Sequence, residues 1–176
     1  MFEFTKPQKE IRKAARDFAK GEFDKELAYE LDKEGQFPQE IWQKAAELGF
    51  IGIHFPEEYS GGGTGLLESV IIAEEFCRKD SSIGGALVLS SFASECLLNY
   101  GNDSLKQQYL TKVTEGDILS GGAFLETDFG LDPADTSTTA TQKGDSWVIN
   151  GTKSNVINGG EAGFYIVLCK TSLEET

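Results

Sequence analysis

Side chains that commonly carry chemistry are sparse in this chain of 176 residues. Its only histidine, His54, stands next to Phe55 and Pro56. No metal-binding side chain follows it at ligand spacing, and no cysteine or serine near it forms a nucleophile pattern. The sequence therefore favours a structural or surface histidine over a catalytic one.

Two acidic pairs and a glycine-rich run are the other candidates. Glu57-Glu58 and Glu74-Glu75 have no surroundings that would raise a carboxyl pKa, so we interpret them as loop and helix-face charges. The run GGGTG at 61–65 lacks the Lys-Ser/Thr of a P-loop and the strand of a Rossmann turn, which leaves a flexible loop. The sequence thus identifies no catalytic residue and no metal ligand.

Composition restricts the partners and the compartment. There are 16 Lys and Arg against 29 Asp and Glu, a net charge of −13, and no basic stripe that would suit nucleic acid or an anionic membrane. Cys77, Cys96 and Cys169 are far apart and odd in number, which predicts free, mostly buried thiols in a reducing compartment. With neither a secretory signal at the start nor an apolar run near ~20 residues, we expect a cytoplasmic protein.

The first two thirds of the chain have helical periodicity. Thr5 with Gln8 forms a capping box, and Pro38 opens a later helix. Residues 84–101 are apolar almost all round, which is typical of a central, buried helix. The other helices are expected at 66–79 and at 103–114.

After Gly116 the pattern changes to strands. We expect them at 118–126, 137–142, 146–150, 152–157 and 163–169, with Asn150-Gly151 as a hairpin turn. Helices followed by strands predict an α+β chain: a helical bundle domain at 1–117 and the start of an antiparallel β-domain at 118–176. The apolar strand 163–169 would be an open edge, covered by further chain, by another subunit, or by the helices themselves.

Four spaced segments of the chain resemble the acyl-CoA dehydrogenase family. They are ELGFIGIHFPEEYSGGG, LLNYGNDSLKQQYL, EGDILSGGAFLETD and GDSWVINGTKSNVINGG. The resemblance implies a helical domain, a middle β-domain and a C-terminal four-helix domain, with FAD between the last two. It also implies α,β-dehydrogenation of an acyl-CoA thioester, electron transfer to an electron-transferring flavoprotein, and a homo- or hetero-oligomer. The family's catalytic glutamate belongs to the C-terminal domain, so we expect no turnover by this chain alone.

The resemblance also indicates the ligand-binding positions. Phe124 and Leu125 would offer backbone donors to the flavin, and Asn155 and Ile157 would face it from the segment VINGTKSNVINGG. Leu131 would stand where the family contacts the CoA part of the substrate. Leu125, Leu131, Asn155 and Ile157 replace the family's threonine, serine, tryptophan and threonine.

These replacements leave alternatives open. The chain is the N-terminal part of a flavin-dependent dehydrogenase, or a pseudoenzyme or assembly subunit that has lost its flavin contacts. A third hypothesis is an unrelated helical binding module.

Overall fold

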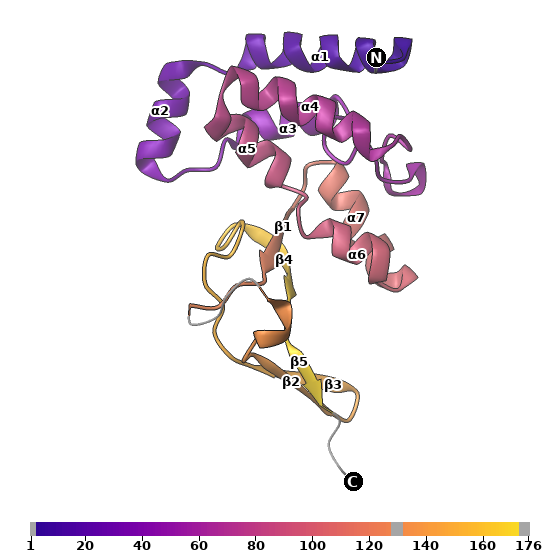
Figure 1. Ribbon diagram of the computed structural model, residues 1–176, viewed down its shortest axis with the longest axis vertical. Helices are drawn as coiled ribbons and strands as arrows, with labels where there is room; N and C mark the ends of the chain where they lie inside the picture. The colour runs from indigo at the N-terminus through magenta and orange to yellow at the C-terminus, as the bar shows by residue number, and fades with distance from the viewer. Residues whose placement is uncertain (1–2, 128–131, 173–176) are drawn as a thin grey trace.

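The computed structural model describes residues 3–127 and 132–172, and its helices precede its strands (Figure 1). The described helices are α1 (Lys6–Glu22), α2 (Lys25–Glu34), α3 (Gln39–Glu47), α4 (Leu66–Lys79), α5 (Ser81–Leu89), α6 (Ser94–Tyr100) and α7 (Asp103–Thr114). The described strands are β1 (Leu119–Ala123), β2 (Thr139–Lys143), β3 (Ser146–Asn150), β4 (Ala162–Val167) and β5 (Lys170–Ser172). Short 3-10 turns occupy Glu57–Tyr59 and Pro133–Asp135. The predicted α+β class is confirmed.

Helix ends follow the local sequence signals. Thr5 caps α1: its hydroxyl accepts from the Gln8 N–H at 3.4 Å, and its own N–H donates to Gln8 Oε1 at 2.9 Å. Asp24 caps α2 through two backbone N–H groups, and Gly35 ends that helix at φ 63°. This geometry confirms the capping box and shows why glycine stands after α2, since a left-handed φ disfavours a side chain.

The helical core is built around aromatic rings. Phe76 of α4 is 1% exposed, and its ring centroid lies 5.5 Å from that of Phe18, 5.4 Å from Phe23 and 5.5 Å from Phe50. These contacts join α4 to α1 and to the segment after α3. A buried carboxylate, Glu75, also joins the two helices, so the prediction that Glu74-Glu75 carries only helix-face charges is wrong for Glu75.

The apolar stretch 84–101 forms two helices rather than one. Between α5 and α6, the Ser120 N–H donates to the Ser90 carbonyl at 2.9 Å, and the Ala93 N–H donates to Ser120 Oγ at 3.1 Å. Strand β1 therefore supplies hydrogen bonds that a continuous helix would make internally, which stabilises the break.

The two helices and the break between them span Ser81–Tyr100, with a mean hydropathy of 1.4. By length and composition alone, this stretch of the described chain is long and apolar enough to cross a membrane. The expectation that no apolar run approaches this length is therefore wrong. Ile83, Leu87 and Leu97 are buried in the cores of the helical part, and we attribute the apolarity to these contacts.

The strands pair in a mixed pattern. β1 and β4 are parallel, with Leu119 opposite Ala162 and Ala123 opposite Val167. The second sheet has the order β3-β2-β5, in which β2 and β3 are antiparallel and β2 and β5 are parallel. Among the named strands of the described chain, the predicted antiparallel pairing thus holds only for the β2–β3 hairpin, which turns at Gly144 with φ 59°. The prediction failed elsewhere because β4 returns beside β1 instead of forming a hairpin with its predecessor.

The predicted strand at 152–157 does not form a named strand, because within it Ser154 and Ile157 make only isolated bridges. Asn150-Gly151 is therefore not a hairpin turn between two strands.

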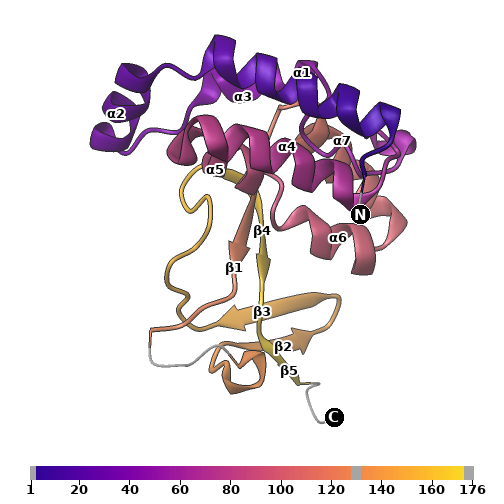
Figure 2. The ribbon, with the colours of Figure 1, turned by 45° about the horizontal axis from the view of Figure 1, so that its top comes forward.

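Figure 2 shows β1 and β4 leading from the helical layer toward the β3-β2-β5 sheet. On β4 the Phe164 ring lies 4.8 Å from the Tyr109 ring of α7, so one side of this strand packs on the helices.

The cysteines are free, as predicted, but the prediction that they are mostly buried is wrong: Cys77 is exposed, and Cys96 and Cys169 are only partly buried.

Candidate functional site

Two segments far apart in sequence run antiparallel at the end of β1. The Gly122 N–H donates to the Ile157 carbonyl at 3.2 Å, and the Ile157 N–H donates back to Gly122 at 3.3 Å. Three residues further on, the Ser154 N–H donates to the Leu125 carbonyl at 2.8 Å. We call residues 122–125 and 154–157 the paired segments. They bring together all four positions that the sequence predicts to face a flavin: Phe124, Leu125, Asn155 and Ile157.

The pairing is interrupted between its two bridges. Asn155 has φ 47°, in the left-handed region that asparagine tolerates better than other residues with a side chain. Opposite this bend, the Phe124 carbonyl accepts from Lys153 Nζ at 3.4 Å. Within the described residues no hydrogen bond engages the Phe124 N–H. The interruption thus leaves a backbone donor available to a ligand.

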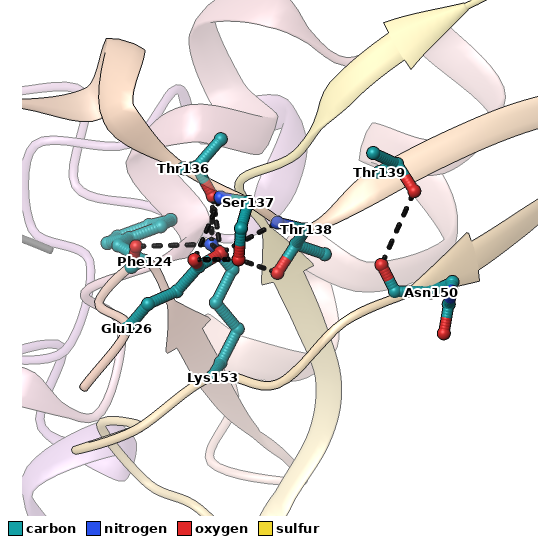
Figure 3. Close-up of polar contacts among 8 residues, drawn as sticks. All are labelled: Phe124, Glu126, Thr136, Ser137, Thr138, Thr139, Asn150 and Lys153. Carbon is teal, nitrogen blue, oxygen red and sulfur yellow. Dashed lines mark hydrogen bonds and ion pairs between the residues drawn. The ribbon is translucent and has the colours of Figure 1, made fainter. Parts of the chain in front are cut away.

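A buried carboxylate, Glu126, fixes the paired segments to residues 136–138, which lie just before β2 (Figure 3). Lys153 Nζ lies 2.8 Å from Glu126 Oε1, joining the two segments directly. Thr136, Ser137 and Thr138 give the same carboxylate hydroxyl hydrogen bonds of 2.5–2.6 Å. The backbone N–H groups of Ser137 and Thr138 add two more, at 2.8 and 2.9 Å. We call this arrangement the Glu126 cluster.

The Glu126 cluster is structural rather than catalytic. Burial alone raises the pKa of Glu126, but the hydrogen bonds from Lys153, Ser137, Thr136 and Thr138 outweigh burial and hold the pKa well below its usual range. A carboxylate that stays ionised and fully hydrogen-bonded is a poor general acid or base at neutral pH. Neither Glu126 nor Lys153 stands out in the sequence by residue type or spacing. The signal that could have identified them is that both lie within segments that resemble the family.

Apolar side chains on and against the first paired segment are partly exposed. The Phe92 ring lies 5.8 Å from the Phe124 ring, and Phe92 and Leu125 are 39% and 41% exposed. A Cβ added to Gly122 would come within 3.1 Å of both rings, so glycine there lets the aromatic pair lie against β1. Phe92, which packs on Phe124, and Leu125, the next residue in the chain, each leave apolar surface exposed in this region.

The fifth predicted position, Leu131, lies outside the described residues. No group of three or more His, Cys, Asp or Glu side chains that could hold a metal ion occurs in the described chain.

The fold and the paired segments define an α+β protein with an unengaged backbone donor beside partly exposed apolar side chains. The N-terminal domain model of acyl-CoA dehydrogenases matches residues 5–117, and the middle domain model matches residues 123–176. The chain belongs to the acyl-CoA dehydrogenase family. Members of this family are FAD-dependent oxidoreductases.

Individual relatives agree with the family models. The chain is 36% identical over 172 residues to an acryloyl-CoA reductase (NADH) of Anaerotignum propionicum, covering 97% of this chain and 43% of that protein. It is 39% identical over 162 residues to the mitochondrial short-chain specific acyl-CoA dehydrogenase of Rattus norvegicus, covering 92% of this chain and 39% of the relative.

A solved structure described as the electron transferring flavoprotein of Acidaminococcus fermentans contains a similar chain. It has a TM-score of 0.85 and 33% identity, and the match covers 95% of this chain and 44% of that one. The chain therefore spans less than half the length of the relatives it matches.

The paired segments fit a flavin through backbone and apolar contacts. A flavin ring needs a donor at its polar edge and a flat apolar surface. The unengaged Phe124 N–H offers the donor, and the partly exposed Leu125 side chain offers apolar surface. Leu125 and Ile157 cannot donate a side-chain hydrogen bond, so any polar contact at these two positions comes from the backbone.

Proposed function

We propose that this chain is the N-terminal part of a flavin-dependent acyl-CoA dehydrogenase and contributes one side of its FAD site. When bound, FAD supplies the hydride acceptor for α,β-dehydrogenation of an acyl-CoA thioester. In this proposal the chain positions the cofactor and does not supply the base of the dehydrogenation. Turnover by this chain alone is not expected.

The interrupted pairing at Asn155 is the observation that supports the proposal most strongly. A regular antiparallel pair would engage its inward-facing backbone donors and acceptors along its length. Here the left-handed residue breaks the pair opposite Phe124, at the position where the family resemblance places flavin contacts. The Glu126 cluster holds the break in place from one side through Lys153.

The chain's own residues have distinct tasks in this site. The Phe124 N–H donates to the polar edge of the ring system, and Leu125 contributes apolar contact to its face. Glu126 and Lys153 hold the two segments at a fixed separation. Preorganised donors of this kind stabilise a ligand because no backbone has to be ordered when it binds.

The proposal extends to partners. The family resemblance and the similarity to the Acidaminococcus fermentans chain support an electron-transferring flavoprotein as electron acceptor. Self-association is supported by β3, where Trp147, Val148 and Ile149 are each 47–53% exposed in succession. We place the protein in the cytoplasm, in keeping with its free cysteines.

A titration of FAD followed by quenching of flavin fluorescence tests the proposal. The wild-type chain should bind FAD, and Lys153→Met should weaken binding at least ~10-fold, which corresponds to about 1.4 kcal/mol. The reason is that the substitution frees the Phe124 carbonyl and removes the ion pair between Lys153 and Glu126, the side-chain link beside the interruption.

Lys143→Met, an exposed change at the β2–β3 hairpin, is the matched control and should bind like wild type. Circular dichroism on each variant separates loss of the site from loss of the fold. A folded wild-type chain with no affinity for FAD would rule the proposal out and would favour a non-catalytic assembly subunit.

A further inference from the structure

His54 bridges two side chains that are distant in sequence. Ser69 Oγ of α4 lies 2.6 Å from His54 Nδ1, and the Glu95 carboxylate of α6 contacts His54 Nε2. The His54 side chain is 14% exposed, so the ring is largely shielded from water. These partners stand 15 and 41 positions away along the chain, so the residues next to His54 in the sequence do not reveal them.

The contacts define the tautomer of the ring. A carboxylate accepts hydrogen bonds only, so the proton of a neutral His54 ring lies on Nε2, facing Glu95. Nδ1 then presents a lone pair to Ser69, whose hydroxyl donates to it. A serine hydroxyl held against a basic nitrogen, with a carboxylate on the opposite nitrogen, has the connectivity of an activated nucleophile.

The glycine-rich loop holds His54 in place. Thr64 Oγ1 donates to the Ile53 carbonyl at 2.8 Å, and the Gly63 N–H donates to the Phe55 carbonyl at 2.9 Å. A Cβ at Gly61 would lie 2.1 Å from the Phe55 carbonyl oxygen, so the loop approaches the histidine segment as only glycine allows. The loop predicted to be flexible is therefore bonded to the residues on both sides of His54.

The Ser69 and His54 side chains line a small cavity between α4 and α5. Its volume is about 70 Å³, and its remaining wall is mostly apolar, with contributions from Ile72, Leu87 and Val88. A single water needs roughly 10–15 Å³ by the same kind of measure, so the cavity admits an acyl group of a few atoms but no long chain. Val88 is 39% exposed and lies at the border with solvent.

We propose that Ser69, His54 and Glu95 form a serine nucleophile site that accepts a short acyl group from an activated ester or thioester. Ser69 Oγ bonds to the carbonyl carbon while its proton passes to His54 Nδ1. The bond to the leaving group breaks, and the leaving oxygen or sulfur takes that proton from His54. Water then attacks the acyl-serine by the same route, releasing the carboxylic acid and restoring the Ser69 hydroxyl. Glu95 keeps the ring oriented and stabilises the transient imidazolium.

Hydrolysis of p-nitrophenyl acetate, followed by nitrophenolate release and by mass spectrometry of proteolytic peptides, tests this site without any flavin. The wild-type protein should release nitrophenolate faster than the Ser69→Ala protein and should carry acetyl on Ser69 after rapid quenching. His54→Gln should slow the reaction by about two orders of magnitude or more, the usual contribution of a general base. Glu95→Gln should give a smaller loss and a changed pH profile.

Ser104→Ala removes an exposed helical serine on α7 and should leave the rate unchanged, which controls for nonspecific acetylation. Melting curves confirm that each variant is folded. Equal rates for wild-type and folded Ser69→Ala proteins would overturn the proposal and leave the three residues as a hydrogen-bonded link between α4, α6 and the loop. Acetyl groups found only on lysines would overturn it as well. Neither result bears on FAD binding, so the two proposals fail separately.

Discussion

At the scale of single residues, Asn155 explains how the chain departs from its family without losing the local shape. The family resemblance places a tryptophan at this position, but the backbone here has φ 47°. Asparagine is among the few residues that adopt this conformation at low cost. Asparagine in place of tryptophan therefore suits the left-handed backbone at position 155. Substitution of Asn155 by tryptophan would add backbone strain.

Substitution at Asn155 tests this explanation. Asn155→Ala should lower the free energy of unfolding by about 1 kcal/mol, because alanine disfavours a left-handed φ. Asn155→Gly should be close to neutral, since glycine adopts this φ freely. Chemical denaturation of the three proteins measures both differences. If alanine and glycine are equally tolerated, the left-handed backbone at 155 is not what selects asparagine.

At the scale of elements, α4 and α5 approach each other through one glycine. A Cβ at Gly84 would lie 2.7 Å from the backbone of Phe76 and Cys77, whereas a Cβ at Gly85 would meet nothing within 4 Å. Two adjacent glycines thus have different roles: Gly84 permits the close contact, and Gly85 only adds flexibility to the unfolded chain.

The two alanine substitutions should have opposite signs. Gly84→Ala should destabilise the fold by about 1–3 kcal/mol, since the backbone of α4 has to move. Gly85→Ala should stabilise it by about 0.5–1 kcal/mol, the usual gain of alanine over glycine inside a helix. Thermal and denaturant unfolding measure both. Destabilisation of similar size at both positions would contradict the close approach of these helices.

The contact between α1 and α4 depends on pH through Glu75. Arg16 donates to both Glu75 oxygens at 2.9 Å, and Arg12 donates to Oε1 at 2.7 Å. The hydrogen bonds from Arg16, assisted by Arg12 and opposed by burial, lower the pKa of Glu75 to about 2. A carboxyl whose folded pKa is depressed stabilises the fold above its unfolded pKa of about 4.3, and this stabilisation is lost as pH falls toward 2.

Acid unfolding should therefore be less steep in Glu75→Gln. The variant should be less stable than wild type at neutral pH, because two arginines lose their partner. Its stability should then change less between about pH 5 and about pH 2. Glu74→Gln, which alters an exposed i,i+4 pair with Arg78, is the control and should keep the wild-type slope. Identical acid slopes for Glu75→Gln and wild type would show that another group governs this pH range.

At the scale of the whole molecule, sequence patterns predict what is local. The Thr5 capping box, the helix opened by Pro38 and the β2–β3 strand pair are set by neighbouring residues, and the structure contains each. Two other features depend on contacts made across the fold, which spacing along the chain does not encode. They are the parallel pairing of β1 with β4 and the break between α5 and α6, where Ser120 of β1 forms hydrogen bonds.

The candidate site divides in the same way. Resemblance to the family identifies Phe124, Leu125, Asn155 and Ile157, and the structure brings these positions together. The Glu126 cluster and the bridge from His54 to Ser69 and Glu95 consist of ordinary polar residues, which become distinctive only when folding places them in contact.

The central claim is that the paired segments hold a flavin through backbone and apolar contacts. The most direct measurement is the absorbance spectrum of the purified chain between about 350 and 500 nm, where a bound flavin absorbs, after incubation with excess FAD and desalting. The account predicts a retained flavin band in the wild-type chain and a stronger one in Leu125→Thr, which adds a hydroxyl at the site. A folded wild-type chain and a folded Leu125→Thr chain that both remain colourless would contradict it.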